Sequence, residues 1–84
     1  MEKVKEVLSF LTEISEDISV SKTVKTKVKS IISVLNDESL EIEIRIDKSL
    51  QQLDEISEDV NIPSFTRTQI WNAVSLLEST QFKH

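Results

Sequence analysis

The sequence predicts an all-α protein, a four-helix bundle of the up-and-down type built from two pseudo-repeated helical hairpins. The first observation is an internal repeat: residues 13–35 recur as residues 55–77, and both copies open with the block EISED. The second is that apolar residues recur every three or four positions in four successive segments. The third is composition, because 84 residues with no glycine and one proline favour short turns between long helices in a single domain, 1–84.

The first two helices are predicted over residues 2–18 and 22–36. Each carries one apolar stripe that can face a core. The hydroxyl of Ser21 is expected to accept a hydrogen bond from a free amide of the second helix and so to cap it. The stripes consist of Val4, Val7, Leu8, Leu11, Ile14 and Ile18 in the first helix and of Val24, Val28, Ile31, Ile32 and Leu35 in the second.

The third helix is predicted over residues 39–60, although residues 40–46 alternate between apolar and polar side chains as a strand does. A lone strand would leave its backbone groups unpaired, so the helix is preferred. Ile44 falls almost opposite the stripe, either as scattered apolar surface or as part of a contact with another chain. The stripe is Ile42, Ile46, Leu50, Leu53, Ile56 and Val60.

The fourth helix is predicted over residues 63–80. Pro63 suits a first helical turn because it lacks an N–H group and has a fixed φ angle. Phe65 in that turn is expected to pack across the hairpin as a hydrophobic staple. The apolar stripe is Ile70, Ala73, Val74 and Leu77.

Composition excludes several classes of site. The chain has no cysteine, so it forms no disulfide or thiolate site, and no apolar run approaches the roughly 20 residues of a membrane span. No signal peptide is recognisable, and a cytoplasmic location is expected. The net charge of −5 argues against general nucleic-acid binding. Residues 19–36 nevertheless carry lysines and no acid, either offset by neighbouring helices or forming a basic strip for an anionic partner.

The acids of the two EISED blocks fall in last helical turns, where the helix dipole disfavours them. We predict that a base across each turn compensates, with Lys25 opposite Asp17 and Arg67 opposite Asp59. The alternative is a divalent-cation site, but neither an EF-hand loop nor a Glu-x-x-His pair is present, so no metal is expected. The acids of that alternative would be Glu13, Glu16 and Asp17, or their copies Glu55, Glu58 and Asp59.

Trp71 lies off the apolar stripe of its helix, at the position that Lys29 occupies in the first repeat. Arg67 lies one turn before it and Glu78 two turns after. Trp and Arg dominate binding hot spots, so Arg67, Trp71 and Glu78, together with Ile44, are the candidate interaction residues. The alternative is that the Trp71 ring covers an edge of the core, with Arg67 stacked on it.

Residues typical of catalysis are scarce. The single histidine is the last residue, there is no tyrosine, and no serine or threonine stands in a nucleophile motif. We therefore expect no enzyme, no cofactor and no small-molecule ligand. A metal-dependent enzyme using the acidic blocks is the remotest alternative.

The segment NIPSFTRTQIWNAVSLLES resembles the signature of a small archaeal group known as uncharacterised protein family 0147. The resemblance covers about residues 8–80 and is most specific at Pro63, Thr66, Arg67, Thr68, Gln69, Ile70 and Trp71. It implies an archaeal four-helix bundle with no established activity and no catalytic residues to assign. The first repeat departs from the pattern, with Ser21 where proline is usual and Lys25 where arginine is common.

The function expected from these observations is a non-enzymatic protein-interaction or assembly module, either self-associating or docking on a larger complex. The alternative is an accessory nucleic-acid or ribonucleoprotein factor that uses Lys22, Lys25 and Lys29 on one helix edge.

Overall fold

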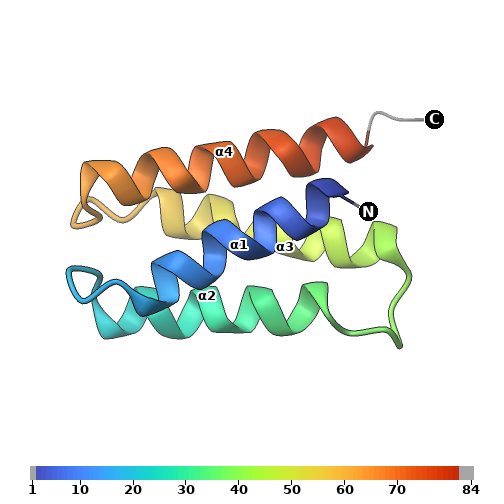
Figure 1. Ribbon diagram of the computed structural model, residues 1–84, viewed down its shortest axis with the longest axis horizontal. Helices are drawn as coiled ribbons and strands as arrows, with labels where there is room; N and C mark the ends of the chain where they lie inside the picture. Colours follow the sequence, from blue (N-terminus) through green and yellow to red (C-terminus); the bar gives the residue numbers. More distant parts are fainter. Residues whose placement is uncertain (1, 82–84) are drawn as a thin grey trace.

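The computed structural model describes residues 2–81 and consists of four helices (Figure 1). They are α1 (Glu2–Glu16), α2 (Lys22–Leu35), α3 (Ile42–Ser57) and α4 (Ser64–Gln81). The described residues contain no strand, so the preference for a helix over the alternating segment is confirmed from Ile42 onward.

The helices form an up-and-down bundle in which each helix packs against two neighbours. α1 packs against α2 and α4, and α3 packs against the same two helices. The α1–α2 and α3–α4 turns lie at the same end of the bundle, and the α2–α3 connection lies at the other (Figure 1). We call the first of these the turn end. The predicted fold class, two hairpins packed together, is therefore confirmed.

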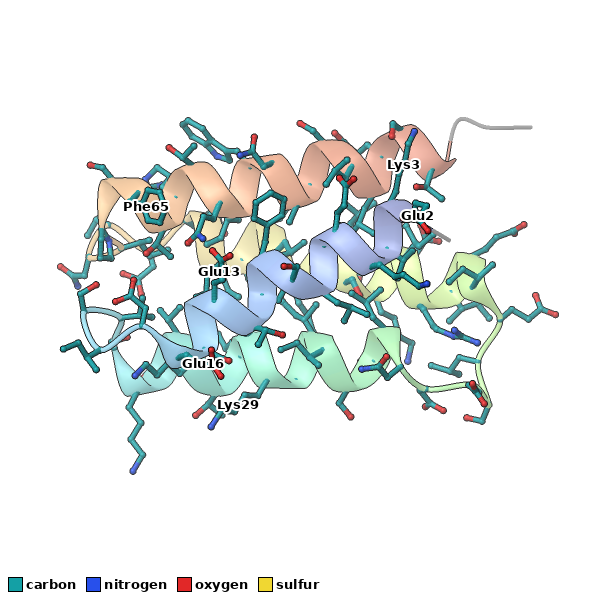
Figure 2. All side chains as sticks on the ribbon, viewed as in Figure 1. Glu2, Lys3, Glu13, Glu16, Lys29 and Phe65 are labelled. Carbon is teal, nitrogen blue, oxygen red and sulfur yellow. The ribbon has the colours of Figure 1, made fainter. Side chains whose placement is uncertain are left out.

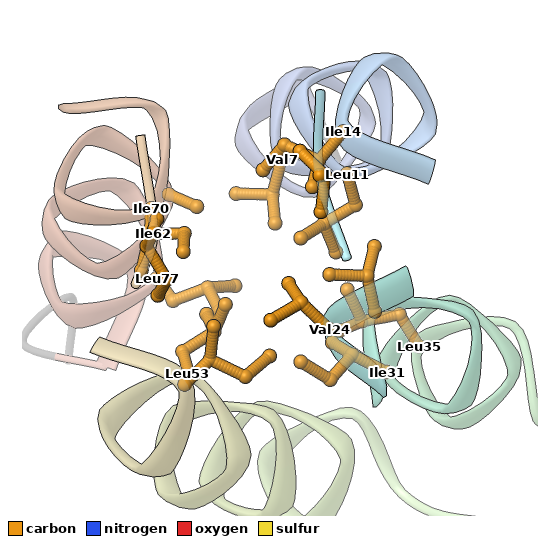
Figure 3. Packing of buried hydrophobic residues seen from close by; sticks show 14 of the residues in the cluster. Val7, Leu11, Ile14, Val24, Ile31, Leu35, Leu53, Ile62, Ile70 and Leu77 are labelled. Carbon is orange, nitrogen blue, oxygen red and sulfur yellow. The ribbon is translucent and has the colours of Figure 1, made fainter. Parts of the chain in front are cut away.

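The core is a continuous cluster of aliphatic side chains from all four helices (Figure 3). Fully burying one such side chain contributes on the order of 1.5–3 kcal/mol, so this cluster is the main source of stability. Val20 and Ile62, which precede α2 and α4, are also buried. The completely or almost completely buried members include Val7, Leu11, Ile14, Val28, Ile31, Leu35, Ile46, Leu53, Ile56, Ile70, Ala73 and Leu77.

The prediction that Ile18 and Val60 belong to the core stripes is wrong. Ile18 is 95% exposed and Val60 is 85% exposed, because α1 ends at Glu16 and α3 ends at Ser57. Beyond these ends the chain turns, and the core positions pass to Val20 and Ile62. Phe65, the predicted staple, is also 68% exposed.

The predicted start of α2 agrees with the structure, whereas α3 begins later than predicted. The Ser21 hydroxyl accepts from the Val24 N–H at 3.3 Å, so the predicted cap is confirmed. α3 begins at Ile42 and not at residue 39, because residues 37–40 form a turn. Arg45 Nε donates to the Leu40 carbonyl at 2.7 Å and holds the entry to this helix.

Thr66 offers a stability test inside the core. Its side chain is fully buried, and its Oγ1 has no hydrogen-bond partner among the described residues. The equivalent position of the first repeat is the buried Val24. Removing an unsatisfied buried hydroxyl without changing the shape of the side chain removes a desolvation penalty. We expect Thr66→Val to raise the free energy of unfolding by about 1 kcal/mol.

Urea denaturation followed by circular dichroism measures this change. Thr68→Val is the matched control, because Thr68 is exposed and its Oγ1 donates to the Ser64 carbonyl at 3.2 Å. A loss of stability in Thr66→Val that exceeds the loss in Thr68→Val would mean that the buried hydroxyl has a stabilising partner.

Candidate interaction surfaces

One turn motif connects all three pairs of consecutive helices. In each turn an Asp carboxylate accepts the backbone N–H of the residue two positions later: Ser19 to Asp17 at 2.9 Å, Ser39 to Asp37 at 3.0 Å, and Asn61 to Asp59 at 2.9 Å. The next N–H donates back to the carbonyl of the Asp, and its residue is Val20, Leu40 or Ile62. Such side-chain bonds fix tight turns without glycine.

The residue that directly follows the Asp points outward in all three turns. In the α2–α3 turn this residue is Glu38, which is exposed, as charged side chains usually are. At the turn end it is Ile18 in one turn and Val60 in the other, and these are the two most exposed large apolar side chains of the described residues. Because the same turn accepts glutamate, its geometry does not require an apolar residue at this position.

Two of these turns also give a prediction about acid stability. Hydrogen bonds from the Ser19 hydroxyl and N–H, with the nearby charge of Lys25, hold the pKa of Asp17 below its ordinary value of 3.8. Ser39, Arg45 and Lys48 lower the pKa of Asp37 in the same way. A lowered pKa in the folded state means that the ionised carboxylates stabilise the fold above pH 3.8, and this contribution is lost as the pH falls through the folded-state pKa.

We therefore expect Asp17→Asn and Asp37→Asn to lose less stability than the wild type as the pH falls below 3.8. Urea unfolding at a series of acidic pH values measures this dependence. Equal slopes in wild type and both variants would show that these carboxylates do not contribute to it.

Three exposed apolar side chains lie at the turn end, namely Ile18, Val60 and Phe65, and we call them together the turn-end patch. Phe65 lies in the first turn of α4, at the end of the bundle where both hairpin turns lie (Figure 2). The acid pairs Glu16–Asp17 and Glu58–Asp59 directly precede the two tip residues. The turn-end patch therefore combines apolar tips with acidic neighbours.

Arg67 fixes the second of the two turns. Its guanidinium donates to the Ser57 carbonyl at 2.6 Å and to the Asp59 carbonyl at 2.9 Å. The Ser57 carbonyl belongs to the last residue of α3 and the Asp59 carbonyl lies just beyond the helix, where acceptors lack helical partners. The contact between Arg67 and Asp59 thus uses the backbone oxygen of Asp59, whereas the carboxylate accepts from Asn61. At the equivalent place in the first repeat, Lys25 acts on Asp17 through its charge.

The other candidate residues lie on different parts of the surface. Trp71 is 56% exposed on the side of α4 that bears Arg67, and Glu78 is exposed two turns further on. Ile44 is 42% exposed and lies in the first turn of α3, at the end opposite the turn end. Ile44 therefore does not join Trp71 in a single cluster by position along the bundle.

α1 and α4 are joined by polar contacts on the side away from Trp71. Gln69 is buried and its Nε2 donates to Glu13 Oε2 at 2.8 Å, while Lys3 Nζ donates to Ser79 Oγ at 2.8 Å. On the opposite side of the bundle, between α2 and α3, lies an open groove of about 440 Å³. Its lining includes Lys27 and Glu55, the repeat equivalents of Gln69 and Glu13. The groove is lined by Lys27, Ser30, Lys48, Gln51, Gln52 and Glu55.

The described part of the chain holds no group of three or more histidine, aspartate or glutamate side chains placed to bind a metal ion. Within residues 2–81, no helix has the length and apolar character needed to cross a membrane.

The model of the group described as Uncharacterised protein family (UPF0147) matches residues 1–80. The chain is also similar to MMP1188, a protein of unknown function whose crystal structure is known, with 41% sequence identity and a TM-score of 0.87. The matched region covers 93% of this chain and 89% of the MMP1188 chain. A crystal structure from the same family in Thermoplasma acidophilum is 32% identical, with coverages of 93% and 92% and a TM-score of 0.88. No curated protein sequence matches.

Proposed function

Because the chain belongs to the uncharacterised protein family UPF0147, to which no activity is assigned, we propose a function from its surface: a non-enzymatic module that binds another protein through the turn-end patch. The observation that carries the proposal is the pair of apolar tips, Ile18 and Val60, displayed on turns of the same design. Glu38 shows that the same turn holds a charged residue in that position.

The contacts that hold the backbone of the two turns support a role of the tips in binding. The buried residues Val20 and Ile62 anchor the turns to the core, and the Asp carboxylates hold the backbone between helix end and anchor. A surface that is already ordered loses little conformational entropy when a partner binds. Ile18 and Val60 can therefore contribute apolar contact area at low entropic cost.

The charges around the tips indicate the chemistry of the partner. Glu16 and Glu58 are exposed beside Ile18 and Val60, so a complementary surface would combine apolar and basic side chains. A second copy of the chain meeting this one end to end would bring like charges together. The proposed occupant is thus a different protein with a basic, partly apolar surface.

Site-directed photocrosslinking in cells that make the protein tests the proposal. A photoreactive benzoylphenylalanine replaces Ile18 or Val60 in the full chain, and the same residue replaces Glu38 as the matched control. We expect one protein to crosslink from positions 18 and 60 and not from position 38. The captured protein is then purified, and its affinity for the wild-type chain is measured directly.

Two results would contradict the proposal. One is equal crosslinking from position 38, which would indicate random collisions. The other is a purified crosslinked protein whose affinity for the chain is unchanged by Ile18→Glu and Val60→Glu.

A further inference from the structure

The two sides of the bundle that lie between the helices of each hairpin carry opposite charge. α1–α2 and α3–α4 lie on opposite sides of the core (Figure 3). We call the surface between α1 and α2 the basic face and the surface between α3 and α4 the Trp71 face. The internal repeat relates their positions to one another, which allows a residue-by-residue comparison.

Hydrogen bonds and groove contacts identify which side of each helix forms each face. Lys3 and Glu13 form hydrogen bonds with side chains of α4. The helical period therefore places Lys5 and Leu8 on the other side of α1, toward α2. Lys27 and Ser30 line the groove toward α3, so Lys29 lies on the side of α2 toward α1 (Figure 2 labels Lys29).

The same reasoning places the Trp71 face. Arg67 reaches the end of α3, and Trp71 and Glu78 share its side of α4. Glu55 lines the groove toward α2, so Asp54 lies on the side of α3 toward α4.

The charges of the two faces are complementary. The basic face carries Lys5, Lys22, Lys25 and Lys29 and the exposed acid Glu16, so its net charge is positive, and the partly buried Leu8 and Ile32 lie among these residues. The Trp71 face carries the exposed acids Glu43, Asp54, Glu58 and Glu78 and the base Arg67, so its net charge is negative, and the partly buried Leu50 and Val74 lie beside Trp71. At equivalent positions, Thr12 corresponds to Asp54, Asn36 to Glu78 and Lys29 to Trp71.

We propose that the Trp71 face binds the basic face of a second copy of the chain. Lysine side chains meet carboxylates and the Trp71 ring, and a cation near an indole ring is attracted to its face. The bundle is 36 Å long and 20–22 Å across, so one side offers on the order of 800 Å², the area that each partner buries in a stable interface. The apolar side chains of the turn-end patch, Ile18, Val60 and Phe65, are not part of this contact.

The position of the two faces determines the form of the assembly. They lie on opposite sides of the bundle, so each copy offers both surfaces and copies add in a row. A two-fold dimer would instead place each face against itself and bring like charges together. The average mass therefore rises with concentration without stopping at a dimer.

Sedimentation equilibrium and Trp71 fluorescence of the full chain test the proposal, because Trp71 is the single tryptophan. At about 10 mM salt, where the screening length is about 30 Å, we expect the mass to rise with concentration. The emission should shift to shorter wavelength as Trp71 leaves water. At about 1 M salt, with a screening length of about 3 Å, both changes should reverse.

Charge reversals then identify the faces. Lys5→Glu with Lys29→Glu, and Asp54→Lys with Glu78→Lys, should each lower the association constant at least about tenfold, because like charges then meet. Mixing the two double variants should restore association. The matched controls, Lys27→Glu with Lys48→Glu and Glu6→Lys with Glu55→Lys, change net charge equally on the other two sides of the bundle and should leave the association of the chain intact.

Circular dichroism confirms that each variant remains helical. The proposal is overturned if the wild type stays monomeric at low salt with unchanged emission, or if the control reversals weaken association as much as the face reversals do. Ile18→Glu with Val60→Glu should associate like the wild type, which separates this contact from the proposed binding at the turn end.

Discussion

Replacing Ile14 by alanine is expected to lower the free energy of unfolding by about 3 kcal/mol, within the range of about 2–5 kcal/mol for buried aliphatic residues. Ile14 is fully buried in the last turns of α1. The substitution removes buried apolar area and leaves a cavity that the close-packed core fills only in part.

Ile18→Ala is the matched control, because periodicity alone assigns both isoleucines to one stripe. Ile18 is almost fully exposed, and surface substitutions usually change stability by less than about 0.5 kcal/mol. Urea denaturation of both variants measures the difference. Similar losses of stability in the two would mean that Ile18 packs against the core, contrary to the structure.

Replacing Arg67 by alanine is expected to lower the free energy of unfolding by about 2 kcal/mol. The change removes two charge-assisted hydrogen bonds and leaves the carbonyls of Ser57 and Asp59 without them. The change also removes the contact between α4 and the α3–α4 turn, so the turn residue Val60 should become more mobile.

Arg67→Lys distinguishes the geometry of the guanidinium from its charge. A lysine ammonium keeps the charge but lacks the planar fork that reaches two carbonyls, so an intermediate loss is expected. Urea denaturation gives the stability, and amide hydrogen exchange of residues 58–62 gives the local opening. Wild-type stability and exchange in Arg67→Lys would show that charge alone accounts for the role of Arg67.

The sequence was sufficient to predict the fold, because the relevant signals are local and repeated. Four apolar stripes, a serine cap at Ser21 and the repeat of the hairpin determine how many helices form and which faces pack together. The alternating segment before Arg45 required a tertiary argument, since a strand there would have had no partner.

The exposure of Ile18 and Val60 was not predicted, because periodicity does not mark where a helix stops. Ile18 and Val60 continue the stripes by spacing, yet the Asp17 and Asp59 carboxylates turn the backbone before those positions. The motif Asp-x-Ser/Asn followed by an apolar residue occurs in all three turns, but it also occurs at residues 47–50 inside α3, so it does not mark a turn by itself. In the three turns the second residue of the motif is exposed, and the fourth is buried at Val20 and Ile62 and partly buried at Leu40.

The environment of Arg67 and Trp71 depends on tertiary contacts that spacing cannot provide. The repeat alignment placed Arg67 across the turn from Asp59, but the backbone carbonyls that it contacts become available only once α3 ends. Trp71 stands off the stripe by spacing alone, and its partial exposure follows from the packing of α3 against α4.

The most direct test of the turn-end patch is calorimetric titration of the purified crosslinked partner into the wild type and into the Ile18→Glu, Val60→Glu double variant. Losing the burial of two aliphatic side chains corresponds to about 3 kcal/mol or more, so we expect affinity to fall more than about a hundredfold while urea unfolding stays unchanged. Unchanged affinity, or a variant that unfolds much more easily than the wild type, would contradict the assignment of the tips to binding.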